Sequence, residues 1–221
     1  MRSNHVLKTS SVVKSQMKLL DIGCGTAHII ESLAVNHERV IFIGLDVSSA
    51  MLKIAKLNTA RLPNVILVKG DGLKLPFSDC SFDVVITRLA EYSPQEVHRV
   101  LKKGGFFFEY DLGPEANKEI LEFFQGRIEK ESFFFPNNLE EWKREVHEKV
   151  MAGGLSVESI DDYKEIEYYQ SVEELMGLIE MVPLVKNFDR EKDKETVEAL
   201  AKRYLSKRGY PNYVALLCAR T

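Results

Sequence analysis

The chain has 221 residues and a formal net charge of −3, and 45% of its residues are hydrophobic. This composition is typical of a globular protein large enough to bury a core, and we expect a single domain over residues 1–221. No basic stripe is present, so an extended nucleic-acid-binding surface is not predicted. No apolar run approaches the ~18 residues of a membrane span. Residues 1–16 lack the apolar centre of a signal peptide, and we therefore expect a cytoplasmic protein.

The three cysteines, Cys24, Cys80 and Cys218, are far apart, and no pair has the spacing of zinc ligands. We expect all three to be small buried hydrophobic residues. No metal site is predicted from them.

The first half of the chain alternates between short apolar runs and amphipathic segments. Residues 1–16 are polar and predict no regular element. We expect strands at 17–22, 39–45, 64–69, 82–87 and 106–110, with helices at 27–35, 48–60 and 94–101. Because these strands are apolar on both faces, the pattern favours a parallel sheet covered by helices on both sides.

The second half, residues 113–221, has a different pattern with longer polar stretches. Here we expect helices at 114–124, 138–151, 172–184 and 191–205, and strands at 155–169 and 213–219. The segment 172–205 is longer than a simple connection between two strands. It is therefore interpreted as a helical insertion near the C-terminus.

Polar residues and glycines gather where the first three strands end. Gly23 and Gly25 follow the first strand, and glycines at that point let a ligand approach the backbone beside the topological switch point. Asp21, Asp46 and Asp71 lie at the ends of three successive strands. A carboxylate after the second strand can accept two hydrogen bonds from a ribose diol.

The acidic strand ends help to choose between nucleotide ligands. A dinucleotide carries a pyrophosphate, which is disfavoured beside carboxylates, and the third glycine of its G-x-G-x-x-G fingerprint is replaced here by His28. S-adenosylmethionine has a sulfonium and an ammonium and no phosphate. The strand ends therefore favour a nucleoside with a cationic tail, such as S-adenosylmethionine, and His28 is interpreted as an ordinary residue of the first helical turn.

Four ordered blocks carry a family resemblance: LLDIGCGTAHIIESLA, GLDVSSAMLKIAK, GDGLKLPFSDCSFDVVITR and EVHRVLKKGGFFF. In order and spacing they resemble the class I S-adenosylmethionine-dependent methyltransferases, in particular the group that acts in quinone biosynthesis and on related small molecules. The resemblance covers about residues 17–112, which are the expected cofactor-binding half, with 113–221 as the substrate half. It implies a Rossmann-like α/β fold with a seven-stranded, mostly parallel sheet, helices on both faces, and a small-molecule methyl acceptor.

The resemblance also implies which residues contact the cofactor. They are Asp21, Gly23, Cys24, Gly25, Asp46, Val47, Asp71, Gly72, Leu73, Thr87 and Arg88. Those after the first strand would hold the methionine portion, and those after the second strand the ribose and one side of the adenine. Those after the third strand would bind the adenine amino group and ring edge, and those after the fourth would face the methyl-transfer end.

The chain departs from the family pattern in two places. Ala27 stands where a third glycine is usual, and because alanine is small we expect cofactor binding to tolerate it. The segment RLAEYSPQ replaces a longer loop and helix that often shape the acceptor pocket. Acceptor binding should therefore rely on other segments.

Methyl transfer mainly requires alignment of acceptor, methyl group and sulfur, and a general base only where the acceptor must lose a proton. No such base can be assigned from the sequence. Weak candidates follow the fourth and fifth strands: Glu91, Tyr92, Tyr110 and Asp111. His98 is interpreted as structural.

The helical insertion offers a further hypothesis. Its apolar residues, including Leu175, Met176 and Ile179, could form a lid over the acceptor or could simply pack as core. The cluster Phe133–Pro136 has the same two interpretations, with Trp142 as its packing partner. Two other functions stay open, a catalytically silent methyltransferase-like binding or activator subunit and, less favoured, a nicotinamide-dependent oxidoreductase. The acceptor and the oligomeric state are not predicted.

Overall fold

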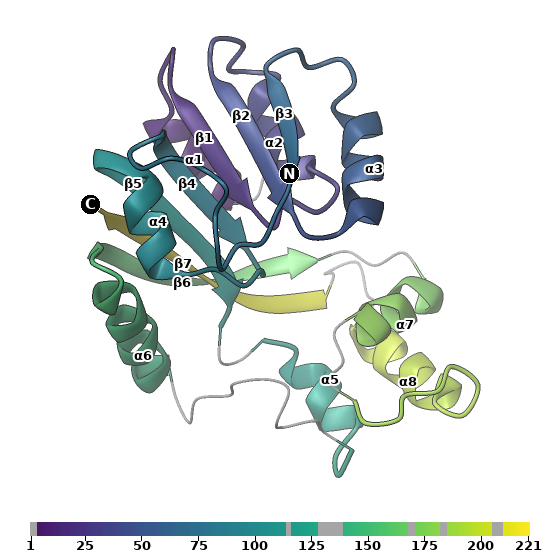
Figure 1. Cartoon of the computed structure of the whole chain (residues 1–221). Helices are drawn as coiled ribbons and strands as arrows, with labels where there is room; N and C mark the ends of the chain where they lie inside the picture. The colour runs from purple at the N-terminus through teal and green to yellow at the C-terminus, as the bar shows by residue number, and fades with distance from the viewer. Residues whose placement is uncertain (1–3, 114–115, 128–138, 168–170, 182–184, 205–209) are drawn as a thin grey trace. The chain divides into compact units, whose positions relative to one another are not determined.

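A computed structural model describes residues 4–113, 116–127, 139–167, 171–181, 185–204 and 210–221. Its seven strands form one sheet in the order β3-β2-β1-β4-β5-β7-β6 (Figure 1). The strands are β1 Lys18–Ile22, β2 Ile41–Asp46, β3 Val65–Lys69, β4 Phe82–Arg88, β5 Leu101–Leu112, β6 Ser156–Glu167 and β7 Tyr210–Arg220. The helices are α1 Asn4–Val12, α2 His28–Ala34, α3 Ser49–Asn58, α4 Pro94–Val100, α5 Lys118–Phe123, α6 Leu139–Ala152, α7 Val172–Met181 and α8 Lys194–Tyr204.

The sheet is mostly parallel, as predicted. β1 pairs in parallel with β2 and with β4, and the parallel pairing continues from β2 to β3 and from β4 to β5. β7 is antiparallel to β5. This direction follows from the hydrogen bond of 3.4 Å that the Thr221 N–H, just after β7, donates to the Gly105 carbonyl near the start of β5. The strand order reverses at β1, whose neighbours β2 and β4 belong to the two halves of the sheet. In such sheets, ligands bind outside the carboxyl ends of the strands at this switch point.

The strand register assigns side chains to two faces, because successive residues of a strand point to opposite sides. One face carries Leu20, Val85 and Phe107, which pack with the buried residues of α4 and α6. The other face carries Asp21 together with Gly44, which packs against Ile30 of α2. Helices therefore cover both faces, and Asp21 lies on the α2 side.

Two expectations about the first half were wrong. Residues 1–16 are not irregular throughout, since α1 packs against α2 and Thr9 is fully buried. This contact between distant segments is absent from the local pattern, which is why the sequence did not predict the helix. Cys80 is exposed and has a φ of 52°, whereas Cys24 and Cys218 are buried as expected. Cys80 lies in the turn before β4, which carries its side chain into solvent.

The chain forms two compact units. The first comprises Met1–Asp111, Lys143–Asp161 and Ala215–Thr221, and the second Leu112–Trp142 and Asp162–Val214. In the second unit, α5, α7 and α8 share a core whose buried residues include Ile120, Phe124, Leu175, Met176, Ile179 and Leu200. The helical insertion is therefore present, and its apolar residues form this core rather than an open apolar surface. The cluster Phe133–Pro136 lies outside the described residues.

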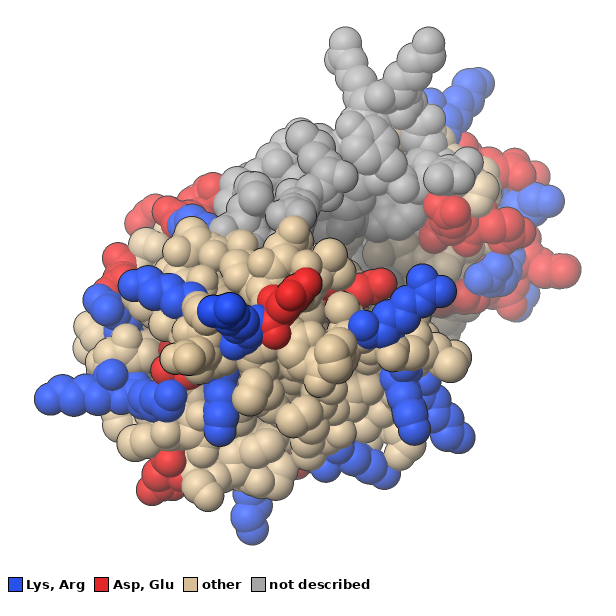
Figure 2. Space-filling model, turned by 90° about the horizontal axis from the view of Figure 1, so that it is seen from above, with Lys and Arg blue, Asp and Glu red and all other residues tan. Residues whose placement is uncertain are grey.

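Charged side chains of both signs are visible on one face of the molecule (Figure 2). On the face drawn in Figure 2, the lysine and arginine side chains of the described residues stand apart from one another, with acidic side chains among them. Within the described part of the chain, no helix is long and apolar enough to cross a membrane.

Candidate cofactor site

The turn after β1 is held in place by backbone hydrogen bonds to the neighbouring strand. Gly23 and Cys24 donate their N–H groups to the Leu45 carbonyl, at 2.8 and 3.0 Å. Gly23 has a φ of 71°, and a side chain there would place its Cβ 2.2 Å from the Cβ of Ala90. Only glycine satisfies both conditions, because the φ is positive and the turn packs directly against the segment that follows β4.

Asp46, the last residue of β2, fixes this turn from the side. Its Oδ2 accepts from the Gly25 N–H at 2.8 Å, and its Oδ1 accepts from the Ser48 N–H at 2.8 Å. The Ser48 side chain in turn caps α3 by accepting from the Met51 N–H. Each carboxylate oxygen has a second lone pair, so Asp46 retains acceptor capacity for a ligand hydroxyl.

The segments after β2 and β3 present two exposed apolar side chains at neighbouring strand ends. Val47 is 70% exposed and Leu73 is 51% exposed. Asp71 organises the second segment by accepting from the Leu73 N–H at 2.8 Å. Gly72 is required by packing, because a Cβ there would lie 2.4 Å from the Glu91 carbonyl oxygen. These strand ends offer apolar surface beside carboxylates, which suits a flat base attached to a ribose.

Asp21 is the most perturbed carboxyl group of the site. It is 3% exposed, and burial raises its pKa to about 8, with the Arg88 charge acting in the opposite direction and the Asp46 charge adding to the rise. An ionised Asp21 is thus costly in the ligand-free protein. A cation bound beside it would lower that cost.

The last two residues of β4 point to opposite sides of the sheet. Thr87 is buried and donates its hydroxyl to the Ile22 carbonyl at 3.2 Å, so its side chain helps to join β4 to β1. Arg88 lies on the Asp21 face, with its guanidinium carbon 5.0 Å from the centre of the Tyr110 ring. Thr87 and Arg88 therefore lie on opposite faces of the sheet at the same strand end, because strand residues alternate.

The weak catalytic candidates fall into different environments. Tyr92 is buried and donates to Glu109 Oε2 at 2.6 Å, while Lys149 lies 3.2 Å from Glu109 Oε1 and 4.1 Å from the centre of the Tyr92 ring. Burial and the Glu109 charge raise the pKa of Tyr92 well above its usual value, which suits a fixed donor better than a base. Tyr110 is also buried, Asp111 is half-buried and Glu91 is exposed. The Tyr92–Glu109–Lys149 network was not predicted from the sequence, because its members lie on separate segments of the chain.

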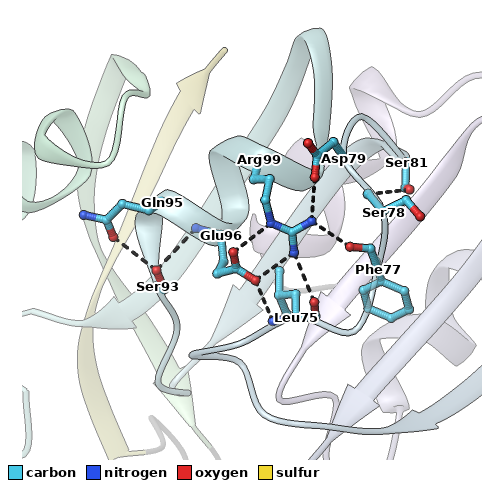
Figure 3. Close-up of polar contacts among 9 residues, drawn as sticks. All are labelled: Leu75, Phe77, Ser78, Asp79, Ser81, Ser93, Gln95, Glu96 and Arg99. Carbon is cyan, nitrogen blue, oxygen red and sulfur yellow. Dashed lines mark hydrogen bonds and ion pairs between the residues drawn. The ribbon is translucent and has the colours of Figure 1, made fainter.

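A second network fixes the loop between β3 and β4 (Figure 3). Arg99 of α4 donates to both oxygens of Glu96, to Asp79, and to the carbonyls of Phe77 and Leu75 at distances from 2.7 to 3.1 Å. Glu96 also accepts from the Leu75 N–H at 2.8 Å. This loop, which contains Asp71, is thereby anchored to α4. The sequence block that contains Arg99 pointed to the region, but not to this contact.

Ala27 and His28, which were singled out in the sequence, can now be placed. Ala27 has a φ of 60° and lies just before α2, so it adopts a conformation that glycine adopts without strain. His28 begins α2 and is exposed, and partial desolvation and the Arg88 charge lower its pKa. Among the described residues, no group of three or more His, Cys, Asp or Glu side chains is arranged to hold a metal ion.

Comparison with known proteins agrees with this geometry. Residues 19–105 match the family model described as a methyltransferase domain. Residues 19–105 therefore carry a methyltransferase domain. The matched residues run from β1 to the start of β5 and contain the glycine turn and the acidic strand ends.

Individual relatives are similar over the same region. Demethylmenaquinone methyltransferase of Staphylococcus epidermidis is 44% identical over 110 residues, which are 46% of this chain and 45% of that protein. Malonyl-[acyl-carrier protein] O-methyltransferase 1 of Coxiella burnetii is 32% identical over 109 residues, covering 46% of this chain and 36% of that protein. The chain thus matches less than half the length of these curated relatives. Among solved structures, the YcgJ protein of Bacillus subtilis superposes with a TM-score of 0.65 at 22% identity, covering 98% of this chain and 97% of that one.

Proposed function

We propose that this methyltransferase domain binds S-adenosylmethionine at the carboxyl ends of β1, β2 and β3 and transfers its methyl group to a small-molecule acceptor. The observation that carries the proposal is the set of carboxylates at three neighbouring strand ends, Asp21, Asp46 and Asp71, around a glycine turn. Asp46 would accept from the ribose hydroxyls, and Val47 and Leu73 would contact the adenine. Asp21 would face the cationic methionine end.

Methyl transfer mainly requires that the protein align the acceptor atom, the methyl carbon and the sulfur. The acceptor's lone pair forms a bond to the methyl carbon as the carbon–sulfur bond breaks, and the electron pair leaves on the sulfur. Positioning of the two reactants can supply roughly 7–11 kcal/mol of the barrier. No side chain of this chain is assigned as a base. The two curated relatives are named for demethylmenaquinone and for a malonyl group on acyl-carrier protein, and these names support an organic acceptor group without selecting one.

Incubation with methyl-labelled S-adenosylmethionine and fractionated metabolite extracts tests the proposal. We expect label to appear in a small molecule, and the D46N variant to reduce the yield at limiting cofactor. Cofactor binding without any labelled product would favour the alternative, a silent binding or activator subunit. Binding of a nicotinamide dinucleotide in place of S-adenosylmethionine would favour an oxidoreductase.

A further inference from the structure

Arg88 occupies a distinctive position at the end of β4. It is paired in register with Tyr110 of β5, and the preceding residue on the same face, Ile86, is fully buried. Arg88 is therefore the first side chain beyond the core on the face that carries Asp21. The neighbouring pair Thr87 and Ile22 places Arg88 level with Gly23 in the glycine turn.

The guanidinium of Arg88 is oriented but not neutralised. It lies 5.0 Å from the centre of the buried Tyr110 ring, which covers part of the group and limits its rotation. Within the described part of the chain, no carboxylate lies at ion-pair distance from Arg88. Asp21 and His28 feel its charge without contacting it. The half-buried guanidinium thus keeps donors available for a partner from outside the chain.

The strand order shows on which side that partner would lie. The nucleoside contacts proposed above run from β1 toward β2 and β3, whereas β4 and β5 lie on the opposite side of β1. The positive charge of Arg88 would repel the sulfonium of S-adenosylmethionine; Asp21 on the same face offsets part of this repulsion, and an anion bound beside Arg88 would offset more of it. An acceptor that carries an anionic group would supply that anion at the required place.

We propose that Arg88 binds a carboxylate on the methyl acceptor, so that the substrate class is a small organic acid. This inference rests on the proposed function. The planar guanidinium presents parallel N–H groups that match the two oxygens of a carboxylate, and the Tyr110 ring holds the plane in place. Arg88 is then a residue that determines acceptor specificity, whereas the reacting atom belongs to another part of the acceptor.

Two acids, benzoate and hexanoate, and their uncharged amides serve as probes. Saturation-transfer NMR on the protein loaded with S-adenosylhomocysteine should detect binding of at least one acid. The protein should bind the corresponding amide far more weakly. R88Q should weaken binding of the acid by about tenfold or more, and R88K should recover part of it, because lysine keeps the charge but not the fork.

R220Q is the matched control, since Arg220 also lies over an aromatic ring, Phe106 at 4.5 Å, but is already paired with Glu158. It should leave binding of the acid unchanged. Equal binding of acid and amide, absence of binding by both acids, or an unchanged affinity in R88Q would overturn the proposal.

The carboxylate that Arg88 binds could also belong to the cofactor itself. A separate binding measurement distinguishes the two sources. If R88Q weakened S-adenosylhomocysteine binding tenfold but left methylthioadenosine, which lacks the amino-acid end, unaffected, Arg88 would hold the cofactor and the acceptor assignment would be wrong. Failure of the wild-type protein to bind S-adenosylhomocysteine would instead contradict the proposed function. In that case, titration of the acids into the cofactor-free wild-type and R88Q proteins still measures whether Arg88 binds a carboxylate.

Discussion

At the scale of single residues, Asp21 links the ligand-free stability of the domain to cofactor binding. Its pKa of about 8 in the folded chain exceeds its value in an unfolded chain, so the folded state holds the extra proton. The stability from this group is fully present below about pH 4 and is lost as the pH rises towards 8. Between those values the ligand-free domain should become progressively less stable.

The D21N variant separates these effects. Because asparagine does not ionise, we expect D21N to unfold at a higher temperature than the wild-type protein at pH 8.5, by an amount equivalent to at least ~1 kcal/mol. The difference should shrink as the pH is lowered towards 5. Thermal unfolding without ligand at both pH values measures it. A D21N variant that is less stable than wild type at pH 8.5 would contradict the assigned environment.

Cofactor affinity should change with pH in the opposite direction. A cationic ligand favours ionised Asp21, so S-adenosylmethionine should bind more tightly as the pH rises from 7 to 9, a range above that in which His28 titrates. D21N should bind more weakly at pH 9 and show no such rise in affinity with pH. Calorimetric titrations at three pH values test this, and a profile unchanged by D21N would remove Asp21 from the cofactor site.

Cys80 provides a test of backbone strain outside the site. Its φ of 52° is unfavourable for most side chains, and its side chain is exposed, so no packing is lost on substitution. Asparagine tolerates this conformation better, and C80N should stabilise the domain by about 0.5–1 kcal/mol. C80A serves as the control and should give no such gain in chemical denaturation. Equal stabilities of C80N and C80A would argue against strain at this position.

At the scale of elements, Arg99 joins α4 to the loop between β3 and β4. Lysine cannot replace its five-donor fork, so R99K should destabilise the domain by about 1–2 kcal/mol. Because the same loop contains Asp71, S-adenosylhomocysteine affinity should fall severalfold as well. R190K is the control, since Arg190 also binds two carboxylates, Glu173 and Glu180, but on an exposed surface. Equal effects of R99K and R190K in denaturation would show that the network is not an anchor.

The elements also show what the sequence could and could not predict. The strand ends were predictable, because apolar runs closed by Gly23 and Asp46 are local signals. The side-chain networks were not, since Tyr92, Glu109 and Lys149 meet only after distant elements pack. The same holds for α1, which depends on its contact with α2. The roles implied for individual cofactor residues stay predictions, and the opposite orientations of Thr87 and Arg88 required the strand register.

At the scale of the whole molecule, a destabilising substitution in one unit should increase local unfolding mainly in that unit. Ile179 is 1% exposed in the core shared by α5, α7 and α8. I179A should therefore cost about 2–5 kcal/mol within the second unit. Hydrogen exchange should rise in residues 116–127, 171–181 and 185–204, while β1 to β4 stay protected.

The burial of these residues also revises the lid hypothesis. Met176 and Ile179 are core residues, so their polar substitution tests the integrity of the second unit before it tests acceptor binding. If I179A retains S-adenosylhomocysteine affinity, the first unit binds cofactor independently of the second unit's core. Simultaneous loss of protection in both units would show that they unfold as one.

Every role proposed above requires that the carboxyl ends of β1, β2 and β3 bind S-adenosylmethionine, and calorimetric titration with S-adenosylhomocysteine in excess chelator measures this binding. The wild-type protein should bind one equivalent, and H28A should bind with nearly the same affinity. D46N should bind about tenfold or more weakly, because Asp46 would lose a charge-assisted hydrogen bond to the ribose. Absence of binding by the wild-type protein, loss of binding on chelation, or equal losses in D46N and H28A would contradict the claim.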